Sequence, residues 1–134
     1  MSDADFEAFF AQREAAGEAY TNGNSSLLDT ILPKQGNASF HSPRGDSVTG
    51  AEAVAARYRT DASSFAPGGK GQFEVLQKSV SGDLAFWSGF QVATVKLKGR
   101  DEPVEMRIRV TEAFRRIDGD WKLIHRHADM GAKP

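Results

Sequence analysis

Apolar residues in the first half of the chain recur every three or four positions, a spacing that places side chains on one face of a helix. Such a helix is expected over about residues 3–21, where the repeating residues are Phe6, Phe9, Phe10, Ala16 and Tyr20. A short second helix is expected over 25–32, because Pro33 disfavours helical backbone in the residue before it. A third helix is expected from Thr49 onward. Its apolar face comprises Ala51, Val54, Ala55, Tyr58 and Ala62.

The second half of the chain follows a different pattern, in which apolar and polar residues alternate as in β-strands. Four strands are expected, over 72–80, 84–97, 104–117 and 120–128, and a short earlier strand over 38–42. The glycine-rich run 67–71 is predicted to be a flexible loop. Three helices followed by an antiparallel meander predict an α+β fold, with the helices packed on a curved antiparallel sheet. Because no linker or repeat interrupts the chain, residues 1–134 are expected to form a single domain.

The strand expected over 84–97 is apolar on both faces. Trp87 and Val95 lie on one side, and Phe86, Phe90 and Val92 lie on the other. An antiparallel sheet normally leaves one face to water, so the second apolar face requires another cover. The simplest cover is a second copy of the chain, which predicts a homodimer packed through the outer sheet face.

Composition narrows the functional classes. The 134 residues carry a net charge of −1 and include no cysteine, which excludes disulfides and thiolate chemistry. A near-neutral charge gives no general attraction to nucleic acid or anionic lipid, and no apolar run is long enough to span a membrane. We therefore expect a cytoplasmic protein with no nucleic-acid or membrane partner. Nucleotide-binding and common hydrolase motifs are absent from the sequence.

The best acid–base candidates lie on the last two strands. Asp118-Gly119 is typical of a two-residue hairpin turn. Counting back from such a turn pairs Phe114 with Leu123 and Glu112 with His125. A carboxyl group and an imidazole among apolar neighbours can exchange a proton, so this pair is the candidate catalytic dyad. The alternative is a buried structural ion pair.

Several other residues are candidates for a binding pocket between the helices and the sheet. They are Gln91, Trp87, Tyr58 and Tyr20, with His127 predicted on the core side of the last strand. A few polar groups among aromatic side chains would orient a small apolar ligand. The alternative is that the aromatic residues form ordinary core. His125, His127 and Asp129 have a spacing that also suits metal ligands, but solvated or hydrogen-bonded histidines are the simpler interpretation, and no cofactor is expected.

Two stretches, Ala38–Gly45 and Arg109–His127, resemble the nuclear transport factor 2 superfamily, in its SnoaL-like and ketosteroid isomerase-like branch. The terminal hairpin is similar to that of the calmodulin-dependent kinase association domain. The resemblance implies a cone-shaped, cystatin-like fold. Ser42 occupies the place of the isomerase's catalytic aspartate. Gln91 and Glu112 occupy the places of the association domain's pocket arginines.

This superfamily includes isomerases, dehydratases, cyclases and assembly domains, so the fold alone does not identify the function. The resemblance and the candidate residues together favour a small-molecule-binding domain with an apolar pocket. Such a pocket would also suit a cofactor-free isomerase, dehydratase or cyclase that acts by proton transfer through Glu112 and His125. The alternative is a non-catalytic oligomerisation module.

Overall fold

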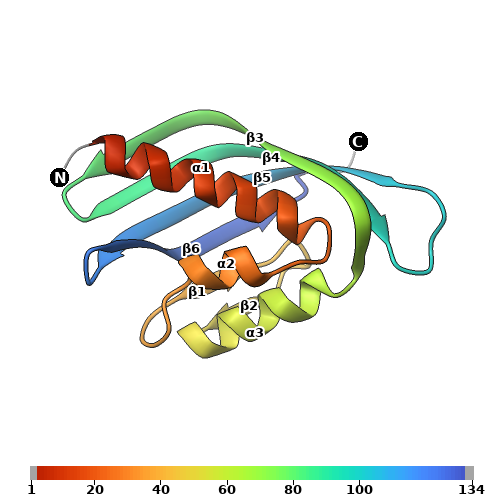
Figure 1. Ribbon diagram of the computed structural model, residues 1–134, viewed down its shortest axis with the longest axis horizontal. Coiled ribbons are helices and arrows are strands. Elements are labelled where there is room, and N and C mark those ends of the chain that lie inside the picture. The colour runs from red at the N-terminus through yellow and green to blue at the C-terminus, as the bar shows by residue number, and fades with distance from the viewer. Residues whose placement is uncertain (1–2, 132–134) are drawn as a thin grey trace.

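The computed structural model describes residues 3–131 (Figure 1). Its elements in chain order are α1 (Asp3–Tyr20), α2 (Ser26–Ile31), β1 (Ser39–His41), β2 (Ser47–Thr49), α3 (Ala51–Ala62), β3 (Phe65–Ser81), β4 (Leu84–Leu97), β5 (Val104–Ile117) and β6 (Asp120–Asp129). The three helices and the final meander confirm the α+β fold that the two periodicities predict. In the described range, no helix is long and apolar enough to cross a membrane.

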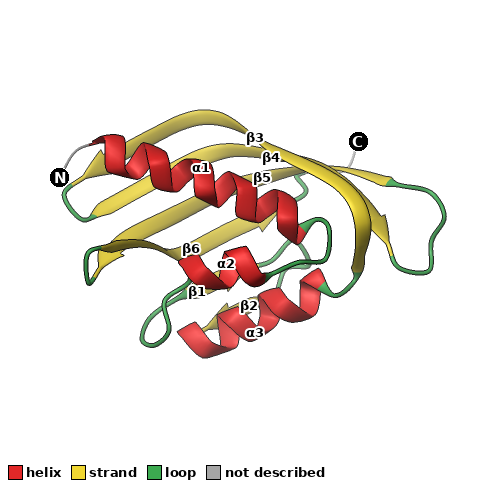
Figure 2. Ribbon diagram, viewed as in Figure 1, coloured by secondary structure: helices red, strands yellow, loops and turns green. Residues whose placement is uncertain are grey.

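The six strands form one curved sheet in the order β2-β1-β6-β5-β4-β3. All neighbouring strands are antiparallel except β1 and β6, which are parallel. Figure 2 shows the sheet bending around one side, with the three helices covering that concave face. The cone-shaped, cystatin-like architecture expected from the resemblance is therefore present, and its concave side faces the helices.

Aromatic residues of α1 pack against the sheet and fill the core. Phe6 is fully buried, and its ring centroid lies 5.5 Å from that of Phe114 and 5.2 Å from that of Trp121. Phe10 packs edge-on against Trp87 at 5.7 Å. The apolar spacing of α1 therefore corresponds to its buried face. Burying side chains of this size contributes about 2–3 kcal/mol each to the hydrophobic term.

The glycine-rich run 67–71 is part of β3, so the flexible loop predicted for it is wrong. A side chain distant in sequence stabilises this segment. The Asn22 side chain accepts hydrogen bonds from the Gly68 and Gly69 amides and donates one to the Gly69 carbonyl. The strand passes so close to the residue that follows α1 that a Cβ on Gly69 would lie 2.5 Å from the Thr21 carbonyl oxygen. Glycine here permits close backbone contact rather than mobility.

Both faces of β4 carry apolar side chains, as its sequence predicts, but only the concave face is covered by the helices. Trp87, Gln91 and Val95 are buried on the concave side. The opposite face carries partly or largely exposed apolar side chains from β4 and from a bulge in β3, and we call these residues the outer patch. They are Leu76, Leu84, Phe86, Phe90 and Val92. Leu76 is 71% exposed and Leu84 is 50% exposed.

Candidate functional site

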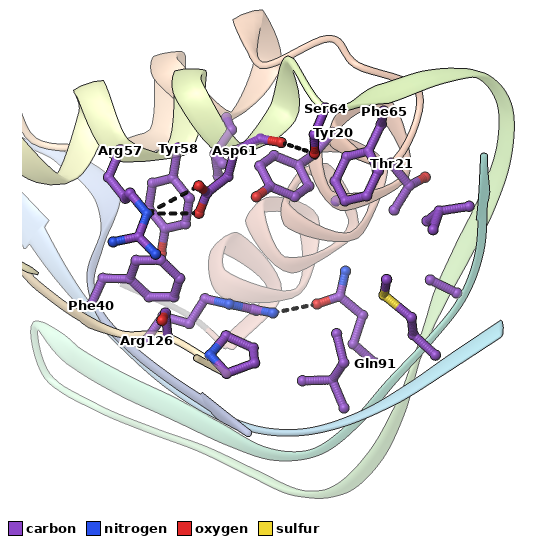
Figure 3. Close-up of a pocket in the computed structure, with 18 of the residues that line it drawn as sticks. Tyr20, Thr21, Phe40, Arg57, Tyr58, Asp61, Ser64, Phe65, Gln91 and Arg126 are labelled. Carbon is purple, nitrogen blue, oxygen red and sulfur yellow. Dashed lines mark hydrogen bonds and ion pairs between the residues drawn. The ribbon is translucent and has the colours of Figure 1, made fainter. Parts of the chain in front are cut away.

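A cavity of about 210 Å³ lies between the helices and the concave face of the sheet (Figure 3). Its deep wall includes Arg13 and Gly17 of α1, Gln91 of β4 and Arg126 of β6. Apolar side chains from helices and strands supply most of the remaining wall. They are Leu28, Phe40, Phe65, Ala93, Val95, Met106, Ile108 and Met130. The cavity is therefore an apolar space with a small number of polar groups, as small-molecule sites usually are.

Glu112 of β5 is the centre of a buried polar cluster beside this cavity. Its side chain is fully buried and its two oxygens accept four hydrogen bonds. Arg13 donates two, from Nε at 2.9 Å and Nη2 at 2.7 Å, and Trp87 Nε1 donates one at 2.8 Å. Arg126 Nη1 donates the fourth at 2.7 Å, and its Nη2 donates to Gln91 Oε1 at 2.6 Å. The Glu112 carboxylate is saturated.

The charges of this cluster do not cancel. Two guanidinium groups share one carboxylate, which leaves a net charge of +1 beside the cavity. Burial alone would raise the pKa of Glu112, but the attraction and hydrogen bonds of Arg13 and Arg126 lower it to about 2. Arg13 Nη1 is buried and has no hydrogen-bond partner. An unpaired buried donor of this kind costs about 1–3 kcal/mol.

Two tyrosines line the cavity on the helical side, as the periodicity of α1 and α3 predicts for Tyr20 and Tyr58. Burial raises the pKa of Tyr20 to about 12, with a further increase from the negative charge of Asp61. Burial also raises the pKa of Tyr58. Both side chains therefore remain neutral phenols at neutral pH. Whether either contacts a ligand stays a prediction.

The rim of the cavity is an ion-pair network between α3 and the loop that joins β1 to β2. Arg57 Nη1 bonds Asp46 Oδ2 at 2.6 Å, and Arg57 Nε lies 3.0 Å from both oxygens of Asp61. Ser42 donates to Asp46 and accepts from the Arg44 amide. Hydrogen bonds from Arg57 and Ser42 lower the pKa of Asp46 well below its usual range. The network holds this loop at the cavity entrance.

The predicted facing pair Glu112 and His125 is wrong. The hairpin count holds as far as Phe114 and Leu123, where the pairing is as expected. Ile124 is then an extra residue in β6, a β-bulge that shifts every later pair by one position. Glu112 therefore faces Arg126, and Ala113 faces His125. The candidate catalytic dyad does not exist, and Arg126 is the buried residue that lies opposite Glu112.

The same shift places His125 and His127 on the outer face of the sheet, beside His41 of β1. The rings of His125 and His127 lie 5.1 and 5.2 Å from that of His41. His125 Nδ1 is hydrogen-bonded to Ser39 Oγ at 2.6 Å. Burial and the two neighbouring imidazoles lower the pKa of His125. His127 is therefore not among the cavity residues, and residues 3–131 contain no group of three side chains arranged to hold a metal ion.

The remaining two residues predicted from the sequence lie at different places relative to the cavity. Gln91 lines the cavity, whereas Trp87 lies behind it and donates its indole hydrogen bond to Glu112. Sequence reasoning missed Arg13, Arg126 and Asp61. A signal existed for Arg13, because it lies between Phe10 and Gly17 on the apolar face of α1. No local signal marked Arg126, whose inward position depends on the bulge.

Comparisons with known proteins agree with this architecture. A model of the SnoaL-like domain family matches residues 3–133. A Streptomyces avermitilis protein of the nuclear transport factor 2-like family, named as a candidate dehydratase, has a TM-score of 0.79 at 21% identity, covering 99% of this chain and 100% of that chain. No curated protein matches the sequence.

Two other similar structures are kinase association domains. One, from Xanthomonas campestris, is named as a candidate calcium/calmodulin-dependent protein kinase II association domain. It has a TM-score of 0.75 at 15% identity, covering 100% of this chain and 91% of that chain. The other is the association domain of the Caenorhabditis elegans kinase. It has a TM-score of 0.67 at 12% identity, covering 95% of this chain and 96% of that chain. At these identities the likeness establishes the fold.

Proposed function

The chain belongs to the SnoaL-like domain family, and from the geometry of its cavity we propose that it binds a small, largely apolar molecule carrying an anionic group. The observation that carries this proposal is the pair of buried arginines, Arg13 and Arg126, which line the cavity and share the single carboxylate of Glu112. The surplus positive charge of Arg13 and Arg126 over Glu112 favours a negative ligand. In a site of low dielectric such an attraction is much stronger than in water.

The size of the cavity limits the ligand. An engineered apolar cavity of about 150 Å³ binds benzene, so the 210 Å³ here suits a single ring with one or two substituents. The apolar wall contributes binding free energy through burial of the ring, while the guanidinium groups select the anionic group. Benzoate has both features and is a suitable probe.

Benzoate and its neutral analogue benzyl alcohol test the proposal. We expect benzoate to raise the thermal unfolding midpoint in proportion to the logarithm of its concentration, and benzyl alcohol to bind at least tenfold more weakly. Ala93→Leu, which places a larger side chain on the cavity wall, should weaken benzoate binding. Val92→Leu changes the adjacent residue on the outer face and is the matched control. Equal binding of the two compounds would contradict the anionic preference.

Proton transfer by Glu112 and His125 is not part of this proposal, because they lie on opposite faces of the sheet. Glu112 is also ionised and saturated with hydrogen bonds, so it is a poor proton acceptor. If the domain catalyses an isomerisation, dehydration or cyclisation, the reacting group must be another cavity residue. Binding of a small anion does not depend on such a reaction.

We also propose that the chain forms a homodimer through the outer face of the sheet. The outer patch supports this proposal, because Leu76 and Leu84 expose apolar surface that no helix covers. Sheet faces of two copies would shield each other by an isologous contact. Sedimentation equilibrium at micromolar concentration should give about twice the 14.6 kDa chain mass. A monomer at all concentrations would contradict the proposal.

A further inference from the structure

A second polar feature of the cavity lies opposite the arginines. Asp61 of α3 lines the cavity near its rim, with Tyr20 beside it, whereas Arg126 and Gln91 lie on the sheet side (Figure 3). The Asp61 side chain is 18% exposed, so it is only partly buried. The cavity therefore has a cationic pole, where Arg13 and Arg126 pair with Glu112, and a separate carboxylate, that of Asp61 on α3.

The carboxylate of Asp61 has unused capacity as an acceptor. Both of its oxygens lie 3.0 Å from the same Arg57 Nε, so a single N–H group is shared between them. The two terminal nitrogens of Arg57 instead contact Asp46, at 2.6 and 3.3 Å. An ionised carboxylate has about four acceptor positions, so most of those on Asp61 remain available to a bound molecule.

The other charges at the rim do not neutralise Asp61. Arg57 is shared by Asp46 and Asp61, so these three side chains carry a net charge of −1. Arg44 also lines the cavity, but it is exposed, and water and salt screen its charge. Tyr20 contributes a neutral hydroxyl. A ligand that reaches this end of the cavity therefore meets an acceptor that favours a hydrogen-bond donor.

We propose that Asp61 is a specificity residue, and that the ligand carries a hydrogen-bond donor, a hydroxyl or an ammonium group, at the end opposite its anionic group. This inference rests on the proposed binding of a small anion, whose anionic group pairs with the arginine pole. The ligand class is then an amphoteric or hydroxylated organic acid with an apolar middle. A hydrogen bond from a donor to an ionised carboxylate is stronger than a hydrogen bond between two neutral groups.

Matched benzoates test this inference on the full chain. The 3- and 4-(hydroxymethyl)benzoates differ from the 3- and 4-ethylbenzoates only by a hydroxyl in place of a methyl group. Calorimetric titration should show at least one hydroxymethyl isomer binding about tenfold more tightly than its ethyl counterpart. Tighter or equal binding of both ethyl compounds would overturn the inference. Binding of unsubstituted benzoate alone would also overturn it, whereas failure of every compound would overturn the proposed function itself.

Asp61→Asn identifies the acceptor. This substitution should reduce the preference for the hydroxymethyl compound over its ethyl counterpart to about twofold or less. Glu52→Gln is the matched control, because it removes one carboxylate from an exposed position of the same helix that lies outside the cavity lining. If the preference persists in Asp61→Asn, the inference is wrong. Should that variant fail to fold, nuclear Overhauser contacts between the ligand methylene and Asp61 in the unaltered protein decide the question, and their absence overturns it.

Discussion

Glu112 provides the negative charge that pairs with two buried guanidinium groups, so its replacement should destabilise the folded protein. In Glu112→Gln, Arg13 and Arg126 would remain buried with no carboxylate partner. Breaking a buried ion pair by removing one partner typically destabilises by about 3–5 kcal/mol. We expect urea denaturation to show a loss of this size. Glu105→Gln, an exposed position on the same strand, should change stability by less than about 0.5 kcal/mol.

The low pKa of Glu112 also predicts a pH dependence. Its pKa is about 2 in the folded protein, against 4.5 for an unperturbed glutamate. A lowered carboxyl pKa stabilises the fold above the unfolded value, and this contribution is lost as pH falls from about 4.5 toward 2. Unfolding free energies measured across this window should fall more steeply in the unaltered protein than in Glu112→Gln. Parallel slopes would contradict the assignment of this titration to Glu112.

Gly17 is a glycine inside helix α1, and its replacement should raise the stability of the protein while lowering its affinity for benzoate. A Cβ at this position would lie 3.4 Å from Arg13 Nη1 and 3.6 Å from Gln91 Nε2, both ordinary contacts. Gly17→Ala should therefore stabilise the protein by up to about 1 kcal/mol through helix propensity. Gly17 also lines the cavity, so the added methyl group reduces its volume and benzoate should bind more weakly. A higher melting temperature with unchanged affinity would show that the ligand does not reach this part of the cavity.

At the scale of elements, two glycines of β3 can test whether this strand requires glycine because the backbone of a neighbouring segment lies so close. Gly69→Ala places a methyl group 2.5 Å from the Thr21 carbonyl oxygen, whereas at Gly71 the nearest atom to a new Cβ is 3.5 Å away. We expect Gly69→Ala to cost about 1–3 kcal/mol and Gly71→Ala to have little effect. Chemical denaturation of both variants measures the difference. Similar losses in the two would indicate a general requirement for flexibility instead.

The elements also show what the sequence could and could not predict. Periodicity placed the three helices and five of the six strands, but it missed β2 and the first residues of β3. The Asp118-Gly119 turn predicted the pairing as far as Phe114 with Leu123. The bulge at Ile124 has no local signature, and it exchanged His125 for Arg126 on the inner face. Because side chains alternate with a period of two, one extra residue reverses every later position. Gln91, on a strand without this shift, was predicted to face inward and does.

At the scale of the molecule, the sheet separates two surfaces. The concave face carries the cavity, and the convex face carries the outer patch and the three histidines. The sequence indicated this division, because β4 is apolar on both faces and the helices can cover only one of them. The second face can be covered only by another molecule. The pattern of one chain indicates that such a cover is needed but does not determine which molecule provides it.

This separation predicts that self-association and ligand binding are independent. Leu76→Glu introduces a charge at the most exposed residue of the outer patch and should convert the proposed dimer to a monomer in sedimentation equilibrium. Leu27→Glu, at a 47% exposed leucine of α2 away from the sheet, should leave the dimer intact. Because Leu76 is not a cavity residue, benzoate affinity should stay within about twofold in both variants. A coupled loss of association and binding would show instead that contact between two copies helps to shape the cavity.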